Sequence, residues 1–544
     1  MDFSEQLNSA LVVEQQPLAQ SHIKHTLQSL GFKHIDFADR AHLALQSLSS
    51  RNYELVLCAY DLNRGADGYQ LFERIMDEGL LSSATTFVFL SSENDMPLSQ
   101  SIIELKPDDF LLKPFTGKEL ELRLKRVLLK KIVLHDVFEA IDKQAFKKAI
   151  SALNEHISTN RNPKWIPYLM KLKGEIIVSA QNWPLAEKFF AKVCQVNDYP
   201  WAKLGLIESL LHQQKLEEAK SMLKDMLETP QYRLQALDLM AQICKRDKNF
   251  DQALEHIKQA SAIAPRNVNR QQQVASLARL THDFELQYNA STSIVRHARH
   301  SIHDTPETYL SAVRAAIDYG VTCLNQDEVN QLALNSESIL HSMRRHFPGI
   351  PLNEQIQVAQ ARILNMKNES DKAKKLIFEN IDAKGIYYID DLEDALDKAK
   401  AFHEMGFHTD SQRLFSQIAT VCDKHDDALL FNEYIKNEQQ LRVEIKQSPK
   451  QLNNQAVGFF SRGNYQGAYE AFRAAFRLMP RNISIALNLM QTIIEHKHLD
   501  LHAEEVQEQI KNCQRVLREN ELSDEQRTRL SKLNQMLHER RVPL

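Results

Sequence analysis

Apolar residues between residues 1 and 125 fall into short runs separated by stretches with helical periodicity. Apolar residues recur at helical spacing after the first run and stop at Gly31, a usual end for a helix. Strands that alternate with helices predict a parallel sheet covered by helices on both faces. The apolar runs that we interpret as buried strands are Leu11–Val13, Leu55–Cys58, Phe87–Leu90 and Phe110–Leu112.

From residue 116 onward the pattern is helical almost without interruption. One helix is predicted to continue from Leu120 through Lys130 and Lys131 to Phe138, with no Gly/Ser-rich linker. The 544 residues include 14 glycines and 16 prolines, too few for many hairpins or a disordered connection. We therefore expect the N-terminal α/β region to be joined rigidly to a long all-helical region.

The helical region contains an internal repeat. Ala186, Ala219 and Ala253 lie 33 and 34 residues apart, in the similar frames NWPLAEKFF, KLEEAKSML and NFDQALEHI. A further copy is AVGFFSRGNYQGAYEAFRAAFRLMP, which begins at Ala456. Small residues at a fixed period predict paired helices that approach closely. The predicted structural residues are Ala186, Ala219, Ala241, Ala253, Pro265, Ala456, Ala468, Phe472 and Pro480.

Composition and charge narrow the class of protein. The apolar content of 43%, the charged content of 25% and the net charge of −4 are ordinary globular values, with no basic footprint for nucleic acid. Six scattered cysteines without a CxxC pair indicate reduced thiols rather than a disulfide or metal framework. No secretory signal or membrane span is visible. We expect a cytoplasmic protein that binds neither nucleic acid nor membrane.

Chemistry-bearing residues follow the ends of the predicted strands. Glu14 and Gln15 follow the first run, Ala59 ends the second, Ser91 follows the next, and Lys113 precedes Pro114 after the last. In open α/β sheets, ligands bind at the carboxyl ends of the strands. These residues should therefore lie around one pocket.

This set resembles, residue by residue, the receiver domain of bacterial response regulators. The resemblance implies a flavodoxin-like sheet of five parallel strands over residues 1–125. It places the family's Mg²⁺-binding acidic pair at Glu14 and Gln15, its hydroxyl residue at Ser91 and its aromatic switch residue at Phe110. It also implies a cis peptide bond between Lys113 and Pro114. The family's phosphate-accepting aspartate falls at Ala59.

Two departures from the family affect its chemistry. A methyl group at Ala59 cannot attack phosphorus, and Gln15 removes one negative charge from the Mg²⁺ site. No cofactor is expected, and Mg²⁺ binding is weak at best. Asp61 is an alternative acceptor, but it lies past the strand end. Another alternative is that the alanine at position 59 was engineered. Gln15 argues against this as the whole explanation, because it is a second departure from the family in the same site.

The helical repeats resemble tetratricopeptide repeats, which implies an all-α solenoid that binds proteins. The predicted plan is a receiver-like domain at 1–125, connecting helices at 126–160, repeats at 161–484 and a C-terminal helical cap at 485–544. The solenoid's binding residues should be exposed residues of its concave face, which the sequence does not identify.

A receiver fused to tetratricopeptide repeats implies bacterial two-component signalling with output through protein binding. The first hypothesis is a non-enzymatic adaptor that binds a sensor histidine kinase or phosphorelay protein and inhibits phosphotransfer without being phosphorylated itself. The alternatives are a phosphorylation-switched response regulator and a scaffold unrelated to phosphorelay. A homodimer through the last receiver helices stands beside a monomer as an open alternative.

Overall fold

The computed structural model describes residues 7–62, 65–92, 101–159, 162–380, 391–425, 427–520 and 522–540. The chain divides into two compact units. The first is Met1–Gln271 with Arg296–Thr305, and the second is Gln272–Val295 with Pro306–Leu544. The predicted boundary between residues 160 and 161 lies outside the described residues, and the four-part plan remains a prediction.

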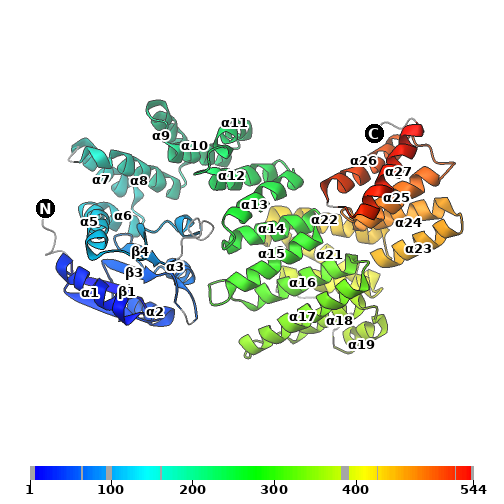
Figure 1. Ribbon diagram of the computed structural model, residues 1–544, viewed down its shortest axis with the longest axis horizontal. Helices are drawn as coiled ribbons and strands as arrows, with labels where there is room; N and C mark the ends of the chain where they lie inside the picture. The colour runs from blue at the N-terminus through cyan, green and yellow to red at the C-terminus, as the bar shows by residue number, and fades with distance from the viewer. Residues whose placement is uncertain are drawn as a thin grey trace. The chain divides into compact units, whose positions relative to one another are not determined.

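The N-terminal part of the first unit is a five-stranded parallel sheet in the order β2-β1-β3-β4-β5. Figure 1 labels β1, β3 and β4 of this sheet. This is the predicted fold class. Leu55 and Leu57 of β3 pack in the core with α1 and α5, whereas Val56 and Cys58 pack in the core with α2 and α3. Every second strand residue faces the same side, so the all-apolar run of β3 fills both cores. The elements are β1 (Ser9–Val13), α1 (Pro17–Leu30), β2 (His34–Ala38), α2 (Ala41–Ser50), β3 (Leu55–Ala59), α3 (Gly68–Asp77), β4 (Thr86–Ser91), β5 (Asp109–Leu112) and α5 (Gly117–Val133).

The connection from the sheet to the helices differs from the predicted continuous helix. The helix breaks at Leu134, where φ is −102° and ψ is 23°, and α6 (His135–Asp142) starts directly after it. Leu134 is fully buried and packs with Val137, Phe138 and Leu153. Burial of this side chain turns the chain at a position where apolar spacing alone indicates no break.

The remaining helices follow one another with short connections, and neighbours along the chain pack together. None of the described helices is both long enough and apolar enough to cross a bilayer. They are α7 (Phe146–Thr159), α8 (Ile166–Ser179), α9 (Trp183–Val196), α10 (Pro200–His212), α11 (Leu216–Leu227), α12 (Arg233–Arg246), α13 (Phe250–Ile263), α14 (Val268–Leu280), α15 (Phe284–Ala298), α16 (Pro306–Thr322), α17 (Gln326–His346), α18 (Asn353–Met366), α19 (Ser370–Asn380), α20 (Leu392–Glu404), α21 (His408–Val421), α22 (Ala428–Glu444), α23 (Pro449–Ser461), α24 (Tyr465–Leu478), α25 (Ile483–Glu495), α26 (Glu504–Glu519) and α27 (Asp524–Glu539).

The turns between paired helices repeat with the same spacing as the alanines. Gln181, Gln214, Lys248 and His282 all have positive φ, between 52° and 64°, and are 33, 34 and 34 residues apart. A left-handed residue ends one helix and redirects the chain into the next. The helix pairs therefore recur at the predicted period, while their identification as tetratricopeptide repeats remains a prediction.

The predicted repeat residues occupy two kinds of position. The alanines and the phenylalanine are buried inside helices, and the two prolines lie partly exposed in the connections after α13 and α24. The buried group is Ala186, Ala219, Ala241, Ala253, Ala456, Ala468 and Phe472, and the prolines are Pro265 and Pro480.

One aromatic ring fits between two helical glycines. A Cβ at Gly174 of α8 would lie 2.6 Å from the Phe190 ring of α9, and one at Gly205 of α10 would lie 2.4 Å from the same ring. Glycine inside a helix costs up to about 1 kcal/mol relative to alanine. Here it lets three successive helices close around one side chain.

Candidate functional site

The sheet brings the predicted pocket residues to one edge. Glu14 and Gln15 follow β1, Ala59 ends β3, Ser91 ends β4 and Lys113 follows β5. The parallel pairings place these strand ends side by side, and Ala59 is in register with Leu90 of β4. The Lys113–Pro114 peptide bond is cis. Phe110 lies within β5 and is partly buried against the core that contains α2 and α3.

The Glu14 carboxylate is already neutralised. The Lys113 ammonium donates to Glu14 Oε2 at 2.5 Å, and the Gln16 backbone N–H donates to Glu14 Oε1 at 3.0 Å. Glu14 is 1% exposed. Both carboxylate oxygens therefore have partners, and the lysine that would pair with a phosphoryl group is held by a residue of the protein.

Gln15 contacts the loop that follows β3. Its Nε2 donates to the Asp61 backbone carbonyl at 3.3 Å, and the Ser92 hydroxyl donates to Asp61 Oδ2 at 3.0 Å. The side-chain amide thus stands where a second carboxylate would repel that carbonyl. Asp61 lies two residues beyond the end of β3 and is itself engaged by Ser92.

These residues do not fit a firmly held Mg²⁺ ion. Mg²⁺ prefers anionic oxygen ligands in near-octahedral geometry. The Glu14 carboxylate is paired with Lys113, Gln15 is neutral, and Ala59 offers no side-chain oxygen. We derive no chemical step through a metal at this pocket.

Ala59 is fully buried beneath the loop that begins α3. The Gly68 N–H donates to the Tyr60 carbonyl at 2.8 Å, and a Cβ on Gly68 would lie 2.4 Å from the Ala59 carbonyl oxygen. Asp67 caps α3 by accepting from the Gln70 N–H at 2.9 Å. The loop is therefore packed tightly over the position where the family carries its nucleophile.

Arg266, which sequence analysis did not single out, binds this loop from the helical part of the same unit. Its guanidinium donates to the Tyr60 hydroxyl and pairs with the Asp67 carboxylate. It also lies over the rings of Tyr60 and Tyr69, at 5.4 and 5.0 Å from their centroids. Burial raises the pKa of the Asp67 carboxyl to about 6, so at neutral pH the carboxylate remains the ionised partner of Arg266.

Two further contacts hold this face of the sheet domain. Arg270 donates to Glu104 at 2.5 Å and to Asp238 at 2.7 Å. Gln70 Nε2 donates to the backbone carbonyls of residues 297 and 299 at 3.1 and 2.8 Å. Arg270 is 166 residues from Glu104 in sequence, and Gln70 is 227 and 229 residues from its two partners, so no local spacing or motif connects these pairs. Only the tertiary fold reveals the contact.

Comparisons with known proteins concern the N-terminal domain. A transcriptional activator, IrlR of Burkholderia pseudomallei, is 27% identical over 118 residues, which are 22% of this chain and 49% of IrlR. The uncharacterized transcriptional regulatory protein YbdJ of Bacillus subtilis is 27% identical over 139 residues, which are 25% of this chain and 56% of YbdJ. The chain thus spans about half the length of the curated relatives it matches.

Among solved structures, a putative response regulator from Chloroflexus aurantiacus is 26% identical and aligns with a TM-score of 0.21 over 23% of this chain and 98% of its own. The receiver domain of an HD domain-containing protein from Pseudomonas fluorescens is 29% identical, with the same TM-score and coverage. Residues 10–125 match the family model described as the response regulator receiver domain. The first part of this chain is a response regulator receiver domain, a domain of two-component signalling.

Proposed function

We propose that the chain is a two-component signalling adaptor that works without accepting phosphate itself. It binds a sensor histidine kinase or phosphorelay protein through protein–protein contacts and inhibits phosphotransfer to another receiver. The single observation that carries the proposal is Ala59, buried at the end of β3 in an otherwise complete receiver sheet.

The pocket supports this proposal beyond the missing nucleophile. Phosphoryl transfer requires an in-line acceptor and a cation that neutralises developing charge. Lys113 is bound to Glu14, and Gln15 is bound to the backbone of Asp61. A domain that keeps the receiver shape but cannot take the phosphoryl group would compete with a phosphorylatable receiver for the kinase.

The long helical region supplies the second part of the proposal. Repeated helix pairs expose an extended surface that commonly binds proteins, an argument from fold alone. Arg266 links this region to the loop that follows Ala59. Occupation of the helical surface by a partner could thus affect the receiver face through a direct contact rather than through phosphorylation. A cytoplasmic location and a homodimer belong to the same proposal.

The first experiment tests phosphate acceptance. The full chain and its Ala59→Asp variant are incubated with Mg²⁺ and acetyl phosphate and then analysed by intact-mass spectrometry, with a phosphorylatable receiver as positive control. We expect no phosphoryl adduct on the native chain. An adduct on the native chain contradicts the proposal, and mapping it to Asp61 establishes the alternative of a phosphorylation-switched regulator.

The second experiment tests inhibition. Partners crosslinked to the chain in its native cells are identified, and a captured histidine kinase is purified with its own receiver. Adding the chain should slow phosphotransfer in proportion to its concentration, with no label appearing on the chain. Binding only to proteins without a histidine-kinase or phosphorelay domain favours a scaffold unrelated to phosphorelay.

A further inference from the structure

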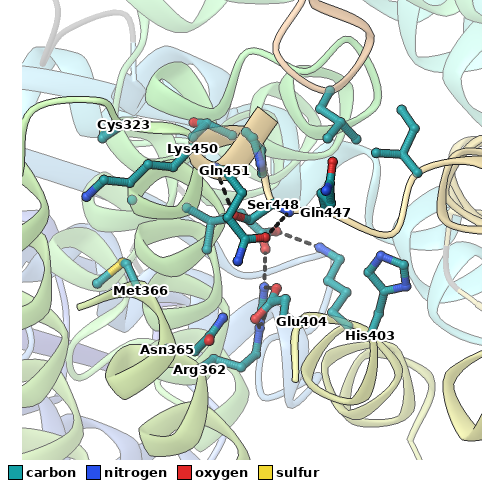
Figure 2. Close-up of a pocket in the computed structure, with 18 of the residues that line it drawn as sticks. Cys323, Arg362, Asn365, Met366, His403, Glu404, Gln447, Ser448, Lys450 and Gln451 are labelled. Atoms are coloured by element: carbon teal, nitrogen blue, oxygen red, sulfur yellow. Dashed lines mark hydrogen bonds and ion pairs between the residues drawn. The ribbon is translucent and has the colours of Figure 1, made fainter. Parts of the chain in front are cut away.

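The second unit contains a polar cavity that is independent of the receiver pocket. Its volume is about 250 Å³. Side chains from α16, α18, α20, α22 and α23 line it. Figure 2 shows Arg362 and Glu404 on one wall, facing Ser448 and Gln451 on the other. A cavity between packed helices with convergent polar groups is a usual form for a ligand site.

The carboxylates that line the cavity are all neutralised by neighbours. Asp318 pairs with Arg362 at 2.8 Å and with Lys400 at 2.6 Å. Glu404 pairs with Arg362 at 2.6 Å, and Glu438 pairs with Arg442 at 2.8 Å. None of these acidic groups is left to attract a cation.

Two lysines of the lining lack such neutralisation. Lys446 has no hydrogen-bond or ion-pair partner within the part of the chain that the structure describes. Lys450 donates to the neutral amide oxygen of Gln326 at 2.8 Å and pairs with no described carboxylate. Both lie on the wall formed by the start of α23 and the loop before it. The charge that remains for a ligand is therefore positive.

One buried polar atom of the lining also lacks a partner. His282 Nδ1 is shielded from solvent and makes no hydrogen bond among the described residues. His282 lies in the turn between α14 and α15, with a φ of 57°, and lines the cavity. The Tyr434 side chain is 2% exposed, and its hydroxyl has no described hydrogen-bond partner. Buried polar atoms are rarely left without a partner, which indicates that something else satisfies His282 Nδ1.

We propose that this cavity binds a small organic anion bearing several carboxylate or phosphate oxygens. The anionic oxygens would face Lys446 and Lys450, and the Tyr434 hydroxyl and His282 ring would hydrogen-bond to the same molecule. This inference does not depend on the proposed signalling function. Because several packed helices line the cavity, a small molecule fits it better than an extended peptide.

The test is isothermal titration of the full chain with two probes, citrate for carboxylates and pyrophosphate for phosphates. Measurements at roughly 0.15 M salt weaken non-specific association of the anions with the protein surface. We expect saturable one-to-one binding of at least one probe, and the probe that binds more tightly identifies the oxygen type. Lys446→Gln and Tyr434→Phe should each weaken that binding by about tenfold or more.

The matched control is Lys436→Gln, which removes an exposed lysine of α22 that does not line the cavity. It should bind the probe as the native chain does. Because Lys446 is exposed, the Lys446→Gln variant should fold normally. If Tyr434→Phe lowers the stability of the protein, binding to Lys446→Gln tests the proposal by itself. Saturable binding of neither probe up to about 10 mM, or unchanged binding in Lys446→Gln, overturns the proposal.

Discussion

The contribution of a buried charge to the stability of the second unit can be calculated for Arg362. Its guanidinium is 1% exposed and donates to Asp318 at 2.8 Å, to Asp397 at 2.5 Å and to Glu404 at 2.6 Å. Arg362→Met keeps much of the side-chain volume and removes the charge. The prediction is that three buried carboxylates lose a shared cation, which should lower the free energy of unfolding.

The neighbours set the size of that loss. Asp318 keeps Lys400 at 2.6 Å, and Asp397 keeps Arg314 at 3.6 Å. Glu404 retains no other ion pair within the described ranges. Removing one member of a buried ion pair typically costs about 3–5 kcal/mol. Because two of the three carboxylates keep a cation, we expect about 3 kcal/mol.

The assay is urea unfolding followed by far-UV circular dichroism. With a slope of roughly 3 kcal/mol per molar urea, the transition of the second unit should move down by about 1 M. All three tryptophans, at positions 165, 183 and 201, lie in the first unit. Tryptophan fluorescence therefore reports the first unit in the same sample.

The controls separate the buried cluster from a general charge effect. Arg413→Met removes an exposed arginine paired with Asp410 and should change stability by less than about 0.5 kcal/mol. Adding Glu404→Gln to Arg362→Met should recover part of the loss, because the stranded carboxylate is then neutral. A loss below about 1 kcal/mol for Arg362→Met, or no recovery in the double variant, would refute the reasoning.

Three further predictions follow from particular contacts. Gly68→Ala should lower the free energy of unfolding by about 1–3 kcal/mol, because the new Cβ would clash with the Ala59 carbonyl oxygen. Gly458→Ala, in open space within α23, should raise it by about 0.5–1 kcal/mol. Thermal unfolding of both variants measures these changes. Burial and the charge of Arg442 lower the pKa of His403 from 6.5 to about 3. At pH 5 this histidine therefore binds a proton in the unfolded chain but not in the folded chain. The free energy of unfolding should fall by about 2 kcal/mol from pH 8 to pH 5 because of this residue. The same pH dependence in the His403→Gln variant would contradict the prediction. Arg266→Gln should speed hydrogen exchange at the backbone amides of residues 60–62 and 65–69, because the guanidinium contacts this loop. Exchange rates equal to those of the native chain would mean that this contact does not stabilise the loop.

Sequence analysis located the receiver domain because its signals are local. Strands such as Leu55–Ala59 are uninterrupted apolar runs, and the pocket residues follow strand ends that a parallel sheet brings together. β2 was not singled out, because His34 and Asp36 interrupt its apolar pattern at the sheet edge. The repeat period was readable because the same small residue recurs in the same frame.

The contacts of Arg266 and the cavity around Arg362 were not predictable in this way. Arg266 follows Pro265 in a polar connection, and its partners lie about 200 residues away. Arg362 is a charged residue within ARILNMKNES, where a solvent-facing position is the ordinary expectation. Its burial depends on carboxylates from α16 and α20, which meet only when the helices pack.

Each left-handed turn is a separate position at which one substitution can change the stability of the chain by a small amount. Gln181, Gln214 and Lys248 occupy a backbone region that costs a residue with a side chain roughly 1 kcal/mol and that glycine enters freely. In a stacked array, the stabilities of neighbouring repeats add approximately. Substitution of a single turn residue can therefore raise or lower the stability of one helix pair, while the buried faces of the helices stay unchanged.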